Sequence, residues 1–222
     1  MPSSATTAGA HRWVGVPADE RRAERRRLLV AAAFELLGTE GDAGTTVRAV
    51  CAATRLNPRY FYESFADRDA LLLAVYDQQV AELGALLSER LATVDDDEAA
   101  FTRTGIETVV RFVAEDPRRA RVLYTEALGN EALARRRVTT LHDVGVALTE
   151  LGRRRHGPPP AGETIGLVAA SMLVGGLTET IVAWLDGHLE VTLDQLIDDV
   201  TALFQATTET TRSITTTRAA GR

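Results

Sequence analysis

The sequence is poor in the residue types that build metal sites and disulfides. Its 222 residues include one cysteine, Cys51, and four histidines that are scattered along the chain. A single thiol excludes an intrachain disulfide and any zinc site built from several cysteines. The chain also lacks an H-E-x-x-H pair, a G-x-G-x-x-G loop and a P-loop, the patterns that hold catalytic zinc, dinucleotides and nucleotide phosphates. We therefore expect no metal, no cofactor and no enzymatic activity.

Long apolar stretches and targeting signals are also missing from the pattern. We find no apolar run of about 18 residues, the length that spans a bilayer. The first ten residues are rich in Ser, Thr and Ala and have no apolar core, so they do not resemble an export signal. Apolar residues make up 45% of the chain and charged residues 25%, which is typical of a soluble globular protein. These features predict a cytoplasmic protein without a membrane partner.

Lysine is absent, so all 25 basic residues are arginines, and charge is spread unevenly. Residues 1–70 carry ten arginines and nine acids, a net charge of +1, whereas residues 71–222 carry fifteen arginines and 22 acids, a net charge of −7. An acidic surface repels nucleic acid, but the N-terminal part is not acidic overall and would not repel it. Because a guanidinium binds two phosphate oxygens at once, the N-terminal part is the candidate for contact with DNA.

Apolar residues recur at spacings of three and four along most of the chain, and no segment alternates like a strand. This periodicity predicts an all-α fold with a three-helix N-terminal head and a larger helical body. The predicted organisation is a disordered arm at 1–18, a helix-turn-helix DNA-binding domain at 19–66, a helical ligand-binding and dimerisation domain at 67–206, and a disordered Thr-rich tail at 207–222.

Two short helices joined by a tight turn are predicted within the head. The second, from Pro58 to Phe65, begins with a proline, which suits a first helical turn because its missing N–H is not needed there. Phe61 and Phe65 face inward on this helix and leave Arg59, Tyr60 and Tyr62 outside. A short exposed helix braced by its neighbours is the geometry that delivers side chains into the major groove of DNA.

The exposed residue types suit that groove. Arginine can pair bidentately with guanine, and a tyrosine can contact a thymine methyl group, a sugar or a phosphate. Arg48 and Arg68 flank the short helix and are candidates for phosphate contact. The predicted DNA-binding residues are Thr46, Arg48, Asn57, Pro58, Arg59, Tyr60, Tyr62, Ser64 and Arg68.

About 50 residues of the head, from Leu28 to Tyr76, resemble the tetracycline-repressor (TetR-type) family. The likeness rests on the runs AAFELL at 32–37, LNPRYFYESF at 56–65 and DRDALL at 67–72. The resemblance implies a homodimeric repressor that binds a palindromic operator and is released by a small-molecule inducer. The rest of the chain agrees with the family only in length and helical character.

The resemblance also implies roles for particular residues. Tyr60 occupies the position of the family's groove-reading threonine, Tyr62 that of its central tyrosine, and Arg68 that of a lysine that binds the DNA backbone. One departure is Arg55, where the turn usually has glycine. If this residue is left-handed, the lack of a glycine costs about 1 kcal/mol.

The last two predicted helices, near 163–185 and 192–206, resemble an interface. The first is apolar on most of its circumference and must be covered on both sides, so a symmetry mate is the expected second cover. The predicted dimer-interface residues are Ile165, Ala169, Met172, Leu173, Gly176, Leu177, Trp184, Leu196, Val200 and Leu203.

The pocket for an inducer is less defined by the sequence. Aromatic and polar residues between the head and the dimer helices favour an apolar or aromatic ligand. The candidate lining residues are Phe101, Phe112, Tyr124, His142 and Met172.

Other functions fit the same pattern less well. A regulator without a ligand, or an activator, would share the head and differ only in the body. A helical protein-interaction module would bind DNA weakly and without sequence preference. An enzyme would need a nucleophile beside a base, and Cys51 is placed as a small core residue without one.

Overall fold

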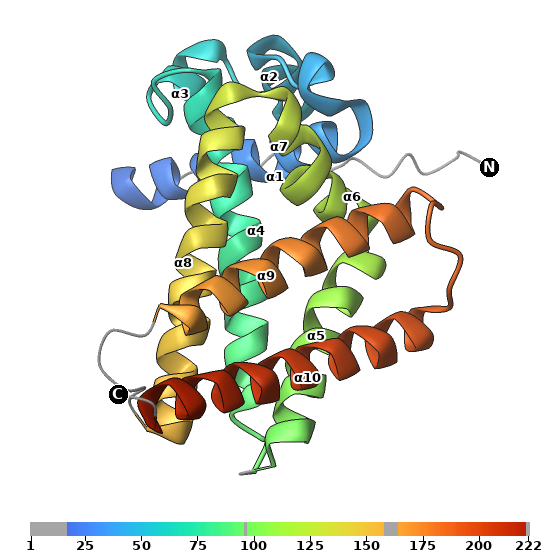
Figure 1. The fold of residues 1–222 in the computed structure, drawn as a ribbon. Helices are drawn as coiled ribbons and strands as arrows, with labels where there is room; N and C mark the ends of the chain where they lie inside the picture. The colour runs from blue at the N-terminus through green and yellow to red at the C-terminus, as the bar shows by residue number, and fades with distance from the viewer. Residues whose placement is uncertain (1–16, 96, 158–163, 221–222) are drawn as a thin grey trace, which may run out of the picture.

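The computed structural model describes residues 17–95, 97–157 and 164–220 of the chain. Every regular element in these residues is a helix, so the prediction of an all-α fold is confirmed (Figure 1). Most of the predicted arm, residues 1–16, lies outside the described residues. The elements are α1 (Ala18–Gly44), α2 (Val47–Thr54), α3 (Pro58–Tyr62), α4 (Arg68–Leu91), α5 (Glu98–Ala114), α6 (Pro117–Ala120), the π-helix η1 (Arg121–Thr125), α7 (Glu126–Gly129), α8 (Glu131–His156), α9 (Ile165–Leu185) and α10 (Leu193–Ala220).

The head forms from local signals that the chain supplies in order. The regular part of α1 ends where Gly41 takes a φ of 77°, a conformation that glycine adopts without steric cost. Thr46 then caps α2 by accepting a hydrogen bond from the backbone N–H of Ala49, and Asn57 caps α3 in the same way through the N–H of Arg59. Arg55 lies between the two helices with a φ of 55°, so the left-handed turn is made by a non-glycine residue.

The core of the head fixes the orientation of α3. Phe61 is fully buried and Phe65 is 5% exposed, which confirms the two inward positions predicted for this segment. Side chains from α1, α2 and α4 share this core with them, and its members include Leu29, Ala33, Leu37, Val50, Leu71, Leu72 and Val75. Burial of a phenylalanine contributes about 1.5–3 kcal/mol, enough to hold a helix that is too short to be stable alone.

The body is built on α4, which leaves the head and runs along the molecule beside α5 and α8 (Figure 1). Helices α9 and α10 lie next to each other across these helices, with α9 against α8 and α10 against α5. Figure 1 places α2 and α3 at the end of the molecule opposite α10. The surface of the head and the outer helices of the body are therefore well separated.

Two predicted boundaries differ from the structure. The helix at Pro58 ends at Tyr62 and not at Phe65, because the chain turns there and Phe65 reaches the core from beyond the helix. The tail predicted to be disordered from residue 207 is instead helical to Ala220. Its threonine hydroxyls donate to the carbonyl oxygens four residues earlier, as from Thr211 to Thr207 at 2.7 Å. Arg212 also forms an ion pair with Glu98 of α5, which anchors the extension to the body.

The segment after α5 contains a π-helical turn inside what the sequence predicts as a plain helix. The single turns α6 and α7 flank η1, and η1 buries Val122 and Leu123 in the core. A π-turn inserts a residue into the helical ladder and occurs often at functional sites. The turn also lies against α1 and α4, so it connects the body to the head.

Two helices, α4 and α9, are long and apolar enough to cross a membrane by length and composition, contrary to the expectation of no such run. The same test is passed by core helices of soluble proteins. Helix α4 buries Leu71, Leu72 and Val75 in the shared core. Helix α9 buries Ile181 but leaves Val168 and Met172 exposed, so its apolar character is only partly explained by packing within one chain.

Candidate functional site

Helix α3 presents three side chains to solvent. The side chain of Arg59 is 83% exposed, and Tyr62 and Tyr60 are 61% and 38% exposed. Tyr62 is therefore the more exposed of the two tyrosines. Tyr62 touches Phe61 edge-on, with ring centroids 5.2 Å apart, and its outer face stays open.

Tyr60 is less exposed because the arginine-rich start of α1 covers part of it. The Arg25 guanidinium lies 4.6 Å from the centre of the Tyr60 ring, a distance at which a cation is attracted to an aromatic face. Glu63 sits between Arg25 and Arg59, at 3.6 Å and 3.1 Å from their nitrogens. These contacts hold Tyr60 and Arg59 in place at the surface of the head.

The same arginine cluster braces the end of the short helix. Arg26 lies 4.2 Å from the Phe65 ring centre and donates a hydrogen bond to the Ser64 carbonyl oxygen at 3.0 Å. Ser64 itself donates to the carbonyl oxygen of Tyr60. Part of the positive charge near α3 is therefore structural, and Ser64 contributes to the helix end through its own hydroxyl.

The remaining predicted DNA-binding residues border α3 from two sides. Arg48 is exposed in the first turn of α2 and forms no ion pair among the described residues. Thr46 and Asn57 are exposed caps, and their side chains accept hydrogen bonds from the backbone N–H groups of Ala49 and Arg59. Pro58 is exposed at the first position of α3. Together with Arg59 and the tyrosines these residues form one surface, which we call the α2–α3 face.

Arg68 is the exception among the predicted DNA-binding residues. Its Nε donates to the Thr45 carbonyl oxygen at 2.7 Å, and its guanidinium pairs with the Asp42 carboxylate at 2.7 Å and with the Asp42 carbonyl. The guanidinium is therefore bound to the end of α1 and not directed at solvent. The sequence does not reveal this because Asp42 lies 26 residues away along the chain.

The five predicted ligand-binding residues do not gather around one cavity. His142 is exposed, and Met172 is 70% exposed on α9. Phe112 is buried against the Arg119 guanidinium, and the half-buried Phe101 lies under that of Arg155. Only Tyr124 lies on the π-helical turn within the body.

Tyr124 belongs to a polar group that sequence reasoning missed. Burial, followed by the proximity of Tyr76, raises the pKa of Tyr124 to about 12. Burial also raises the pKa of Tyr76, which is 3% exposed. A side-chain hydrogen bond with Thr140 and the positive charge of Arg137 act in the opposite direction and lower this pKa. Arg137 pairs with Glu179 of α9 at 3.0 Å, while its buried Nε has no hydrogen-bond partner.

The predicted dimer residues divide into two groups. Leu196 and Val200 are 2% and 6% exposed and pack into the core of their own chain, so their assignment to the interface is wrong. Periodicity identifies an apolar stripe on α10 but not which neighbour covers it. Leu177 and Trp184 also pack against the core, and the Trp184 indole N–H donates a hydrogen bond to the Val191 carbonyl oxygen at 2.9 Å.

The outer face of α9 and α10 remains apolar and open. Met172 of α9 and Leu203 of α10 are 70% and 66% exposed, and Val168, one turn before Met172 on α9, is 54% exposed. Helix α9 also carries the exposed Gly176 and the half-buried Ile165, Ala169 and Leu173. We call the group formed by Val168, Met172 and Leu203 the outer apolar face.

Head and body are joined by hydrogen bonds around the end of α1. Arg121 of η1 donates to the Thr39 carbonyl at 2.7 Å and pairs with Glu126 at 2.8 Å. Glu126 in turn accepts the backbone N–H of Asp42 at 2.8 Å. A Cβ on Gly41 would lie 2.7 Å from the Arg121 guanidinium, so only glycine allows this close contact. We call these contacts the α1–η1 junction.

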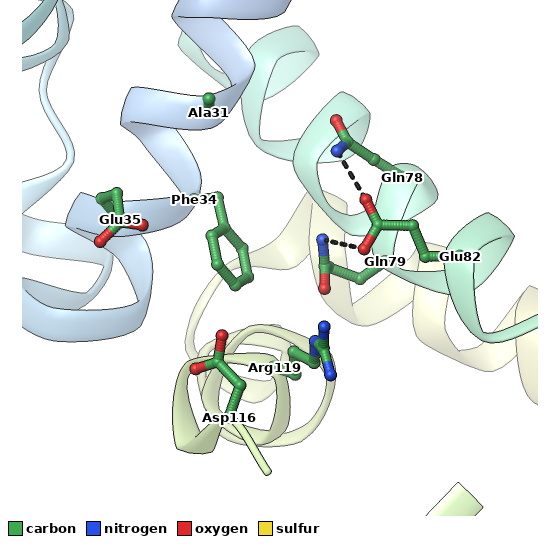
Figure 2. A pocket seen from close by; sticks show the side chains of 8 residues that line it. All are labelled: Ala31, Phe34, Glu35, Gln78, Gln79, Glu82, Asp116 and Arg119. Atoms are coloured by element: carbon green, nitrogen blue, oxygen red, sulfur yellow. Dashed lines mark hydrogen bonds between the residues drawn. The ribbon is translucent and has the colours of Figure 1, made fainter. Parts of the chain in front are cut away.

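Two pockets open on the surface of the described residues. One, of about 160 Å³, lies between the head and the body and is lined by Ala31, Phe34, Glu35, Gln78, Gln79, Glu82, Asp116 and Arg119 (Figure 2). The other lies between α5 and α10. Neither contains a predicted ligand residue. Among the described residues no group of three or more His, Cys, Asp or Glu side chains is arranged to hold a metal ion.

Comparisons with known proteins agree with this architecture. Residues 29–75 match the sequence model of the bacterial regulatory proteins of the tetR family. The fatty acid degradation regulator FadR from Bacillus halodurans superposes with a TM-score of 0.67 at 17% identity, covering 81% of this chain and 94% of that one. FadR from Bacillus subtilis in complex with stearoyl-CoA gives 0.64 at 17% identity over 80% and 96% of the chains. A TetR-like transcriptional regulator from Rhodococcus sp. RHA1 gives 0.61 at 19% identity over 86% and 96%.

Proposed function

We propose that this chain is a transcriptional regulator that binds a palindromic operator as a cytoplasmic homodimer, because residues 29–75 match the tetR family model and the fold is shared with TetR-like regulators. We propose further that a small molecule bound in the body releases it from DNA. The observation that carries the proposal is the α2–α3 face, where a core-anchored short helix displays Arg59, Tyr60 and Tyr62 to solvent.

Several features of that face favour entry into the major groove. The buried Phe61 anchors α3 in the core, while Arg25 and Glu63 contact the exposed side chains of Tyr60 and Arg59. Ordered side chains lose little conformational entropy on binding. The Arg48 guanidinium and the side chains of Thr46 and Asn57 supply donors for phosphates on either side of the groove. The residues then divide by role: Arg59, Tyr60 and Tyr62 contact bases, and Arg48, Thr46 and Asn57 contact the backbone.

The outer apolar face supports dimerisation. A cluster in which Met172, Leu203 and Val168 are each more than half exposed is unfavourable in water, and such patches mark interaction sites. A second copy related by two-fold symmetry would cover the face with itself. The same symmetry would give two heads for two half-sites about 34 Å apart, which one five-residue helix cannot read alone with useful affinity.

The route from ligand to DNA is proposed to run through η1. Tyr124 lies on this turn beside Tyr76, and Arg121 on the same turn contacts the end of α1 through Thr39. A ligand that displaces Tyr124 would move the α1–η1 junction and with it the spacing of the two heads. The apolar or aromatic ligand expected from the sequence fits such a site, and the similar FadR structure holds stearoyl-CoA, a ligand with a long apolar chain.

The test of DNA reading compares two substitutions in the α2–α3 face on a fragment selected from random duplex DNA. Tyr60→Ala is expected to weaken binding to that fragment by about tenfold or more while sparing unrelated DNA, because base contacts are worth about 1–3 kcal/mol. Arg48→Ala is expected to weaken both and to lower the salt slope by about one.

Arg90→Ala serves as the control, because Arg90 is an exposed arginine at the far end of α4. It should leave both affinities and the salt slope unchanged. Equal and small effects of Tyr60→Ala, Arg48→Ala and Arg90→Ala would refute the assignment of the α2–α3 face.

A further inference from the structure

The pocket in Figure 2 lies where three segments meet, and we call it the junction pocket. Helix α1 supplies Phe34 and Glu35, α4 supplies Gln78, Gln79 and Glu82, and the start of α6 supplies Asp116 and Arg119. It therefore borders the head, the helix that links head to body, and the body itself. It contains neither Tyr124 nor any other residue of the proposed inducer site.

A buried amide oxygen faces this pocket without a partner. Gln79 is 3% exposed, and its Nε2 donates to the Glu82 carboxylate at 3.3 Å. Its Oε1 is buried and has no hydrogen-bond partner. Figure 2 shows this oxygen at the end of the amide away from Glu82, on the side of Arg119. A buried acceptor in this position is unfavourable unless a donor reaches it, so the pocket is built to receive an N–H or O–H group.

The charges around the pocket leave one carboxylate without a cation. Arg118 holds Asp116 at 2.8 Å and also pairs with Glu35. Arg119 donates to the Phe112 carbonyl oxygen at 3.0 Å. Within the described part of the chain, Glu82 accepts hydrogen bonds from the side-chain amides of Gln78, at 2.7 Å, and Gln79. Three carboxylates and two guanidinium groups give the surroundings of the pocket a net charge of −1, and Glu82 is the carboxylate for which no guanidinium contact is found among the described residues.

The third element of the site is the ring of Phe34, which Figure 2 shows projecting toward the pocket from α1. The Arg118 guanidinium already lies 5.2 Å from the centre of this ring, so the ring is placed to attract cations on its face. An aromatic ring, an unpaired carboxylate and a free amide oxygen together match a flat group that is positively charged and donates hydrogen bonds.

We propose that the junction pocket binds a small planar organic cation with N–H donors, of the amidinium or protonated-amine class. The cation stacks on Phe34, donates to the Gln79 oxygen and neutralises Glu82. The pocket volume of about 160 Å³ limits the ligand to roughly one ring with its substituent.

A ligand held there would also affect the head. Because Phe34 belongs to α1 and Glu82 to α4, an occupied pocket ties the head to the body at a point separate from the α1–η1 junction. This regulatory part of the proposal rests on the proposed function, whereas ligand binding itself does not.

The experiment measures binding of benzamidinium to the full chain by titration calorimetry without DNA, with neutral benzamide as the paired probe. Benzamidinium should bind and benzamide should bind at least about tenfold more weakly, because only the cation pairs with Glu82. Glu82→Gln should weaken benzamidinium by about tenfold, and Gln79→Leu by several-fold. Glu89→Gln is the matched control, since Glu89 is exposed on the same helix outside the pocket.

Three results would overturn the site: no binding of benzamidinium, equal binding of benzamide, or the same affinity in Glu82→Gln and Glu89→Gln. Circular dichroism of each variant shows that the fold is kept, and Gln79→Leu removes a buried unpartnered oxygen and should not lower the unfolding temperature. A separate DNA titration tests regulation. Saturating benzamidinium should change the affinity of the wild type for selected DNA by several-fold and that of Glu82→Gln not at all. Unchanged affinity in both would overturn the regulatory part alone.

Discussion

The head and the body of this molecule are both helical, yet their sequences determine them in different ways. In the head, each short helix starts at a capping side chain and ends at a residue with a specific backbone conformation, as at Asn57 and Arg55. In the body, long helices could pack in several ways, and the observed choice depends on contacts between distant residues such as Arg137 and Glu179. The head is thus fixed by local rules, and the body by long-range packing.

The largest expected effect separates two adjacent aromatic residues in the head. Phe61→Ala should lower the free energy of unfolding by about 3–5 kcal/mol, because Phe61 is fully buried and its removal leaves a cavity. Tyr62→Ala should change stability by about 0.5 kcal/mol or less, because the ring is largely exposed, but it should weaken DNA binding. Denaturant unfolding and DNA titration of both variants test this contrast, and a similar stability loss in both would contradict it.

In the body, the corresponding test addresses the outer apolar face. Met172→Arg should weaken the dimer by at least about 100-fold, because the interface would then bury an unpaired charge. Sedimentation analysis should find monomers that still give the helical signal of the wild type. The control is Ala81→Arg, at an exposed position on α4. A Met172→Arg variant that remains as dimeric as Ala81→Arg would show that this face is not the interface.

A smaller effect is expected at Arg68, which is either a DNA contact or a residue that stabilises the fold. Here the charged hydrogen bonds to Thr45 and Asp42 predict that Arg68→Ala costs about 1–3 kcal/mol of folding free energy. The Arg48→Ala variant should keep full stability and lose salt-dependent DNA affinity. If Arg68→Ala reduced only DNA affinity and left unfolding unchanged, Arg68 would be a DNA contact as the sequence first indicates.

The smallest effect concerns the pH dependence of the body. The pKa of Tyr124 is raised from 10.0 to about 12 by burial, so the stability linked to its neutral form is present below pH 10 and is lost as pH rises through 12. Tyr124→Phe, which cannot ionise, should unfold at a higher temperature than the wild type at pH 11 and at a similar temperature at pH 8, apart from any constant offset. Thermal unfolding at pH 8 and pH 11 tests this prediction. A difference in unfolding temperature between the two proteins that is the same at both pH values would contradict it.

The same division explains what the sequence could predict. The proline at the start of α3 and the inward pair Phe61 and Phe65 are local signals, and each appears in the structure as expected. Arg55 is left-handed, which is the conformation for which the sequence predicts a cost of about 1 kcal/mol. The short helix and its exposed residues can therefore be predicted from the sequence alone.

The failures lie where distant segments meet. Periodicity places Leu196 and Val200 on an apolar stripe, but only packing against the rest of the chain turns that stripe inward. The tail has no apolar pattern of its own, and its helix is anchored by the contact of Arg212 with Glu98, 114 residues away. The junction pocket combines three segments, so no single stretch of sequence contains its signal.

The central claim is that two copies of the α2–α3 face read DNA together, and selection from a random duplex pool tests it most directly. The account predicts enrichment of an inverted repeat whose half-site centres are separated by about 34 Å, one turn of B-DNA or a multiple of it. Enrichment of a single asymmetric site, or no enrichment above that given by the Tyr60→Ala variant, would contradict it.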